Sequence, residues 1–247
     1  MDLGLQGRKA AVAASSSGLG LGAARALAAE GCAVVMNGRD PERLATAAES
    51  VPGAVTVVGD VGTVAGAEAF VASASEALGG VDILVTNAGG PPAGTFASTS
   101  IADYAPALEQ SLTASAALCH AAVPAMQARG WGRVIAITSI SVRQPIATLL
   151  LSNTARAGLT GFLKTLAREV AGDGVTVNSL QPGYHVTPRL EEVRGGDLDS
   201  LAAEVPVGRL GDADDFGRIA AFLCSEAAGF ITGSALPVDG GAHAGLQ

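Results

Sequence analysis

Short runs of apolar residues alternate along this chain with longer stretches in which apolar residues recur every three or four positions. The runs are continuous rather than alternating, which is typical of strands buried on both faces of a parallel sheet. The predicted strands are 10–13, 33–36, 55–58, 82–86, 133–137, 175–180 and 235–238. The predicted helices are 18–30, one opening at 41, 64–78, 101–128 and 152–171. We therefore predict an α/β fold: a doubly wound, mostly parallel, seven-stranded sheet with helices on both faces.

The sequence shows no linker, repeat or low-complexity tract, so one domain over residues 1–247 is predicted. A net charge of −8 argues against a nucleic-acid partner, which usually requires a basic surface. No apolar run is long enough to span a bilayer, and residues 1–9 lack the apolar core of a signal peptide. We expect a cytoplasmic protein with no membrane partner.

The three cysteines are widely spaced and form neither a metal pattern nor a disulfide framework, so no metal site is predicted. Cys119 and Cys224 lie in apolar helical stretches, which favours buried small side chains over a catalytic thiol.

A glycine- and serine-rich segment follows the first predicted strand and opens the first helix. Glycines at such a turn let the backbone approach a pyrophosphate, and the helix N-terminus favours its negative charge. The serine hydroxyls add hydrogen-bond donors. The candidate cofactor-binding residues of this segment are Ser15, Ser17, Gly18, Leu19 and Gly20.

Three further loops follow strands and therefore meet at the same edge of a parallel sheet. They carry Arg39, the pair Asp60-Val61, and the run Asn87-Ala88-Gly89. A cation just after the second strand can pair with the 2′-phosphate of NADP, whereas an acidic residue there would bind the ribose of NAD. Asp40 next to it is a good helix N-cap with Pro41 at the first helical position. Arg39 favours NADP, with NAD as the alternative and an ordinary solvated charge as the other interpretation of this arginine.

These segments resemble the short-chain dehydrogenase/reductase family, in particular its 3-oxoacyl-carrier-protein reductases, nearly from end to end. The family's Thr-Gly-x-x-x-Gly-x-Gly appears at residues 13–20 with Ala14 at the first glycine, and its Asn-Asn-Ala-Gly appears at 86–89 with Thr86 first. The resemblance implies a Rossmann-type dinucleotide site, with Asp60 and Val61 at the adenine. It also implies that Pro182, Gly183 and Thr187 lie beside the nicotinamide.

The family's catalytic tetrad of Asn, Ser, Tyr and Lys is altered in this sequence. By the same resemblance, Ser139 matches the family's serine, with Ser141 close enough to compete for that assignment. Ser111 stands at the Asn position, Ser152 at the Tyr position and Arg156 at the Lys position. A Ser hydroxyl is a much weaker acid than a Tyr hydroxyl, and Arg stays protonated, so Arg156 can bind ribose hydroxyls but cannot relay protons.

Other residues could supply the missing proton donor or bind substrate. Tyr184 and His185 follow Pro182-Gly183 and are the nearest candidate acids in the sequence, although packing is the favoured interpretation of both. Arg143 either binds an anionic substrate or faces solvent. The charge-rich stretch 189–197 is the best candidate for a mobile lid beside a ligand.

The leading hypothesis is an NADP-dependent oxidoreductase that reduces a carbonyl or conjugated small-molecule substrate with an atypical proton-donor set. The 2,4-dienoyl-CoA reductases resemble this chain in having Ser at the Tyr position, although they keep the Lys. The alternatives are a non-redox enzyme (a cyclase, dehydratase or isomerase) and a catalytically silent binding or regulatory protein. The resemblance, with the Ala- and Leu-rich outer helices, implies a homodimer or homotetramer.

Overall fold

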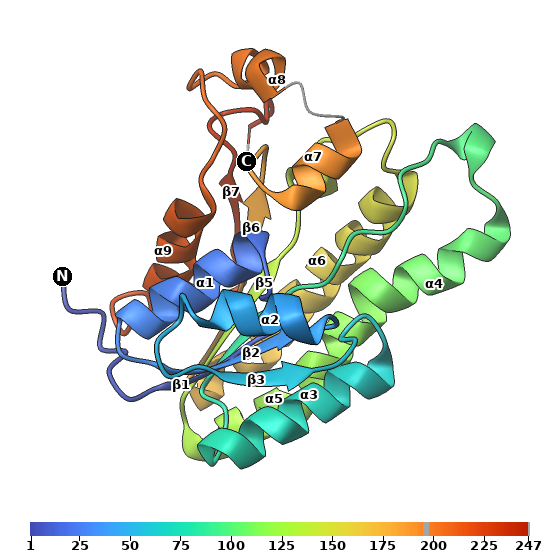
Figure 1. Ribbon diagram of the computed structural model, residues 1–247. Helices are drawn as coiled ribbons and strands as arrows, with labels where there is room; N and C mark the ends of the chain where they lie inside the picture. The colour runs from blue at the N-terminus through green and yellow to red at the C-terminus, as the bar shows by residue number, and fades with distance from the viewer. Residues whose placement is uncertain (195–197, 247) are drawn as a thin grey trace.

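Seven parallel strands form one sheet in the computed structural model, which describes residues 1–194 and 198–246 (Figure 1). The strand order is β3-β2-β1-β4-β5-β6-β7. The chain therefore winds outward from β1 in one direction and then returns to continue in the other, which confirms the predicted doubly wound topology. The strands are β1 (Lys9–Val12), β2 (Ala33–Gly38), β3 (Val55–Val58), β4 (Ile83–Thr86), β5 (Gly132–Ile137), β6 (Val175–Pro182) and β7 (Ala235–Val238).

Helices cover both faces of the sheet, and each face has its own apolar core (Figure 1). One face is covered by α1 (Gly18–Ala29), α2 (Pro41–Ala48) and α9 (Ala213–Cys224), which bury Leu27, Leu44 and Phe216. The other face is covered by α3 (Val64–Leu78), α5 (Ala114–Arg129) and α6 (Leu150–Val170), which bury Phe70, Leu118 and Leu159. Two short helices, α7 (Pro188–Arg194) and α8 (Leu198–Glu204), lie beyond the carboxyl ends of the strands.

Side-chain caps fix where several helices begin. Asp40 accepts hydrogen bonds from the backbone N–H groups of Glu42 and Arg43, so α2 starts at Pro41 as predicted. Thr63 accepts from Gly66 N and starts α3 at the predicted residue. The α6 helix begins at Leu150, two residues before the predicted start.

The predicted helix over 101–128 is present, but it is not a regular α-helix throughout. The segment opens with a 3₁₀ turn at Ile101–Asp103, continues as α4 (Tyr104–Leu108), widens into a π-turn at Glu109–Thr113 and then continues as α5. The π-turn has a local cause, because the Thr113 hydroxyl and the Ala114 N–H both donate to the carbonyl of Glu109. Asp103 also accepts from Ser100 N, which favours a separate capped turn at the start.

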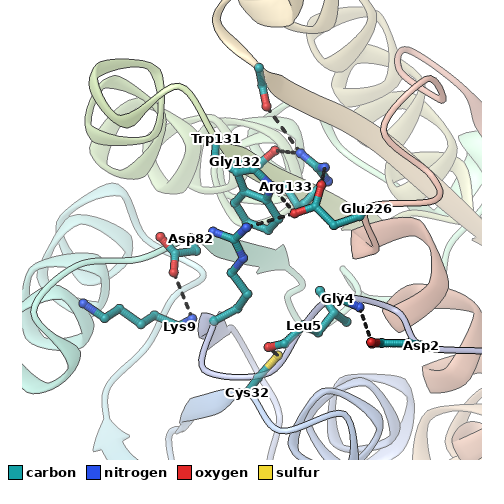
Figure 2. A network of polar contacts seen from close by, with 12 residues as sticks. Asp2, Gly4, Leu5, Lys9, Cys32, Asp82, Trp131, Gly132, Arg133 and Glu226 are labelled. Atoms are coloured by element: carbon teal, nitrogen blue, oxygen red, sulfur yellow. Dashed lines mark hydrogen bonds and ion pairs between the residues drawn. The ribbon is translucent and has the colours of Figure 1, made fainter.

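A cluster of cations around Trp131 ties together the amino-terminal edge of the sheet (Figure 2). The guanidinium carbons of Arg8 and Arg133 lie 3.7 Å and 4.3 Å from the centroid of the Trp131 ring. Glu226 accepts from Trp131 Nε1 at 3.0 Å and pairs with Arg8 at 2.9 Å. The cluster joins the start of β1, the start of β5 and the segment after α9. It therefore holds the sheet at the edge opposite the carboxyl ends of the strands.

None of the helices in the described residues combines the length and apolar character needed to cross a membrane.

Candidate functional site

A cavity of about 390 Å³ opens at the carboxyl ends of the strands. Its wall is built by the segments that follow β1 to β6, together with the start of α7. Fifteen of the residues predicted to bind cofactor or act in catalysis line it: Ser17, Gly18, Leu19, Arg39, Asp60, Val61, Asn87, Ala88, Gly89, Ser139, Ser152, Arg156, Pro182, Gly183 and Thr187. Ser15, Gly20 and Ser111 are not among the lining residues.

The turn between β1 and α1 presents backbone and hydroxyl groups to the cavity. Ser16, Ser17 and Gly18 line it at the N-terminus of α1, and Gly18 has a φ of +55°, a conformation that favours glycine. The Ser15 hydroxyl points away from the cavity, since it donates to Val12 O at 2.8 Å and accepts from Asn37 N at 3.0 Å. Ser15 therefore joins β1 to β2 inside the protein.

Ala14 takes the left-handed conformation that a glycine would adopt more easily, with a φ of +45°. Two hydrogen bonds hold it there: Asn87 Nδ2 donates to Ala14 O at 3.1 Å, and Ala14 N donates to Asn37 Oδ1 at 3.2 Å. A methyl group on Gly20 would lie 2.5 Å from Ala14 O and 2.9 Å from Asn87 Nδ2. The absence of a side chain at Gly20 therefore leaves room for the hydrogen bond between Asn87 Nδ2 and Ala14 O.

Two arginines stand at the end of the cavity beside β2. Arg39 and Arg43 both line it, and Arg39 is exposed, with Nη1 3.9 Å from Asp60 Oδ2. The Asp40 carboxylate caps α2 through its Oδ1 and is not among the residues that line the cavity. Arg43 was missed at the sequence level, although a helix that starts at Pro41 places residue 43 in its first turn, next to the end of β2.

Ser139 and Ser152 lie at the opposite end of the cavity. Ser139 follows β5, lines the cavity and accepts from Ser141 N at 3.0 Å. Ser141 is buried, its hydroxyl lacks a partner among the described residues, and it does not line the cavity. The structure thus brings Ser139, rather than Ser141, to the cavity wall.

The Arg156 guanidinium is fixed by three hydrogen bonds beside these serines. Its Nη1 donates to the carbonyls of Ile137 and Thr138 at 3.0 and 3.2 Å, and its Nε donates to Ser152 Oγ at 3.3 Å. Burial, and secondly the positive charge of Arg189, lower the pKa of Arg156 to about 10. Arg156 therefore stays cationic at neutral pH and brings a fixed positive charge to the Ser152 hydroxyl.

Ser111 lies in the π-turn, away from the cavity wall. It is buried, and its hydroxyl has no hydrogen-bond partner among the described residues. Its neighbour Gln110 lines the cavity instead, with Nε2 3.1 Å from where a methyl on Gly89 would lie. Gln110 was missed because a regular helix was predicted through this turn.

Tyr184 and His185 both line the cavity. The His185 ring packs edge-on against Phe216 at 5.2 Å between centroids, and burial lowers its pKa. It is therefore neutral at pH 7 and poorly suited to act as an acid. Arg143 neither faces solvent nor points to a ligand, because it donates to Gln181 Oε1 and to Ala235 O, both at 2.6 Å.

The charge-rich stretch predicted as a lid begins as a helix. Arg189 and Leu190 of α7 line the cavity, as does Thr187, whose hydroxyl accepts from Leu190 N at 3.2 Å. Residues 195–197 of the stretch lie outside the described residues. The first part of the expected lid is thus an ordered wall of the cavity.

The three cysteines offer no nucleophile at this site. All are buried, and burial raises the pKa of Cys119 to about 12.

The residues of the cavity fit a nicotinamide dinucleotide phosphate. The β1–α1 turn offers a helix N-terminus and a glycine-permitted backbone approach for a pyrophosphate. Arg39 and Arg43 offer paired cations for a 2′-phosphate, and Asn87, Ser139, Ser152 and Arg156 offer hydrogen-bonding groups at the far end.

Comparisons with known proteins agree with this arrangement. Residues 13–243 match the family model described as enoyl-(acyl carrier protein) reductase. The chain is 30% identical over 246 residues to a 3-oxoacyl-[acyl-carrier-protein] reductase of Aquifex aeolicus, covering 98% of this chain and 99% of the relative. It is 38% identical over 168 residues to an acetoacetyl-CoA reductase of Cupriavidus necator, covering 68% of each.

Among solved structures, the L-sorbose reductase of Gluconobacter frateurii, in complex with NADPH and L-sorbose, superposes with a TM-score of 0.92 at 37% identity, covering 100% of both chains. The sheet order, the cavity at the carboxyl ends of the strands and these matches lead to one conclusion. This chain belongs to the short-chain dehydrogenase/reductase family and is an oxidoreductase of that family.

Proposed function

We propose that this protein is an NADPH-dependent reductase of a carbonyl or conjugated substrate, in which Ser139, Ser152 and Arg156 replace the family's usual proton-donor set. The observation that carries the proposal is the hydrogen bond from Arg156 Nε to Ser152 Oγ, with both residues on the cavity wall. It gives a weakly acidic hydroxyl a permanently charged neighbour. Such a pair can stabilise a negatively charged oxygen but is poorly suited to protonate it.

In this proposal, Ser152 takes the place of the family's Tyr, Arg156 that of its Lys, and Ser111 that of its Asn. Ser152 accepts from Arg156 and keeps its own O–H to donate to a substrate oxygen. Ser139, which accepts from Ser141 N, can donate its own O–H to the same substrate oxygen as a second donor. The cofactor, when bound, supplies a hydride. In this proposal, the proton that completes the reduction comes from water.

A conjugated substrate suits this donor set better than a simple ketone. Hydride addition at the carbon β to a carbonyl leaves an enolate, whose oxygen needs hydrogen bonds and nearby positive charge. The enolate then takes its proton at carbon. A ketone instead needs a proton delivered to oxygen as the hydride arrives, and the pair of Ser152 and Arg156 is poorly suited to deliver it.

The choice of NADPH over NADH is supported by Arg39 and Arg43 at the end of β2 and by the position of Asp40, which caps α2 and does not line the cavity. The L-sorbose reductase, with the same fold at 37% identity, was solved with NADPH. NADH remains the alternative cofactor.

We also propose that the chain forms a homodimer or homotetramer. The support is the small-residue composition of the outer surfaces of α5 and α6, and the exposure of Phe230 and Leu236 beside the edge strand β7. Light scattering that gives the mass of one chain at micromolar concentration would overturn this assembly.

The experiment that tests the function is a fluorescence titration with NADPH and with NADH, followed by the double variant Ser152→Tyr/Arg156→Lys. We expect selective NADPH binding by both proteins. We also expect that only the double variant reduces simple ketones, while the parent reduces conjugated substrates. Absence of nucleotide binding would overturn the redox function and favour a non-redox or regulatory role. Ketone reduction by the parent that is lost in the double variant would show that another acid serves the site.

A further inference from the structure

A second arginine lines the cavity that Arg156 lines, and its charge acts on Arg156. Arg189, in the first turn of α7, lies across the segment after β4: a methyl group on Gly90 would stand 3.1 Å from its Nη2. The same Nη2 donates to Pro91 O at 2.8 Å. Arg189, from α7, and Arg156, from α6, therefore line the same cavity.

The charge of the cavity wall is opposite to that of the protein. The chain has a net charge of −8, yet the charged residues on the wall are four arginines and one acid, Asp60. Arg39 and Arg43 stand at the adenosine end. Arg156 donates to Ser152 and Arg189 lines the same cavity, and the proposed hydride transfer by itself gives no reason for this second cation.

Neither guanidinium of this pair is fully neutralised. Within the described residues, the Nε and Nη1 of Arg156 donate to a serine hydroxyl and two carbonyls, and its Nη2 has no hydrogen-bond partner. Arg189 pairs with Glu192 at 2.8 Å, but the Glu192 side chain is 68% exposed, so water screens that pair. Burial is the larger cause of the lowered pKa of Arg156, and the positive charge of Arg189 adds to it, so each arginine makes the charged state of the other less favourable. An anion between them would remove this repulsion.

We propose that Arg189 and Arg156 bind the carboxylate of an anionic substrate, so that the preferred substrates are small α,β-unsaturated acids. Arg189 is then a specificity-determining residue, and Arg156 serves both the carboxylate and Ser152. The inference rests on the proposed reductase function, because it names the substrate class of the same cavity.

The competing explanation is that Arg189 only ties α7 to the segment after β4. The two explanations differ in what a change at residue 189 does. If Arg189 only holds α7 in place, its replacement should change the binding of every substrate equally. If it binds a carboxylate, its replacement should weaken the binding of acids and leave the binding of their esters unchanged. The variant Arg189→Gln keeps a side-chain donor for Pro91 O and removes the charge. The variant Arg189→Lys keeps the charge and loses the planar pair of donors.

The test uses two matched probe pairs, crotonate with methyl crotonate and 4-oxopent-2-enoate with its methyl ester, titrated by calorimetry into the NADP⁺-loaded protein. The parent should bind at least one acid about tenfold or more tighter than its ester, the range of a charge-assisted hydrogen bond. Arg189→Gln should remove that preference, and Arg189→Lys should retain part of it. The control is Arg168→Gln, the same charge change at an exposed residue of α6 away from the cavity.

Equal or absent binding of acid and ester by the parent would overturn the inference, as would a preference that survives in Arg189→Gln. An Arg189→Gln variant that binds NADPH about tenfold more weakly would also overturn it, since the arginine would then serve the cofactor. The same titrations without nucleotide keep the two proposals apart. Acid preference in a protein that binds no NADPH would refute the reductase and keep the anion site, whereas NADPH binding without acid preference would do the reverse.

Discussion

Replacing Gly217 by Ala should destabilise this protein strongly, although the same change at Gly161 should stabilise it. Gly217 lies in α9, where it crosses α1. A methyl group there would stand 2.1 Å from Gly22 O and 2.3 Å from Gly22 C. Gly161 lies in the middle of α6, and a methyl group there would meet nothing within 4 Å. Both are helix interiors, so the two variants differ in packing alone.

The geometry sets the size of each effect. Ordinary contact for a methyl carbon begins at 3.4 Å, so α1 and α9 would have to separate by more than 1 Å. Overpacking of a rigid neighbour costs about 3 kcal/mol, and Ala recovers about 1 kcal/mol of helix propensity. We expect Gly217→Ala to lose about 2 kcal/mol of unfolding free energy, or roughly 4–8 °C in Tm for a chain of this size. Gly161→Ala should gain about 0.5–1 kcal/mol.

The measurement is urea denaturation followed by circular dichroism, with the slope m compared between the variants. Because α1 carries the turn at Gly18, Gly217→Ala should also weaken NADPH binding. An unchanged or raised midpoint for Gly217→Ala would refute the reasoning, since the two backbones would then have room to part. A lowered midpoint for Gly161→Ala would show that a second chain packs on that face of α6.

Three further predictions concern the cavity. Arg39→Gln should weaken NADPH binding by roughly 10- to 100-fold, the contribution of charge-assisted hydrogen bonds, and should leave NADH binding unchanged in a fluorescence titration; an equal loss for both nucleotides would contradict the 2′-phosphate role. Arg156→Gln should lower kcat for methyl crotonate, a conjugated substrate without a carboxylate, by about 100-fold with little change in KM, and steady-state kinetics that show only a raised KM would instead place the arginine in ground-state binding. Because the pKa of buried His185 is lowered, its contribution to stability is present above the unfolded value of about 6.5 and is lost as pH falls through the lower folded value. Urea midpoints at pH 7 and pH 5 should therefore differ less for His185→Phe than for the parent, and an equal fall in both would exclude His185 as the cause.

Hydrophobic pattern alone was enough to predict the sheet. Buried parallel strands leave continuous apolar runs, and caps such as Asp40 mark helix starts in the sequence. The π-turn at Glu109–Thr113 was not predictable in this way, because it depends on one threonine hydroxyl and does not end the helix. Site residues were predictable where they follow strands, since the topology brings those loops together.

Positions set by side-chain direction were not predictable from the sequence. Ser15 and Ser17 are two residues apart in one turn, yet the first binds β1 and β2 and the second lines the cavity. Arg143 offered two interpretations in the sequence, and the structure supports neither, because the side chain turns back to hold β6 and β7. These outcomes depend on which backbone carbonyls and side-chain oxygens lie within reach of the side chain. The local sequence does not determine those partners.

The cation cluster at the amino-terminal edge of the sheet gives the protein a built-in optical reporter. Trp131 is the one tryptophan of the chain, and it lies between Arg8, Arg133 and Glu226, at the edge of the sheet away from the cavity. Its emission should therefore follow the separation of the starts of β1 and β5, which flank β4 in the sheet, during unfolding. Nucleotide bound at the far edge should leave that environment intact and alter the emission only through energy transfer, so folding and binding can be followed separately in one sample.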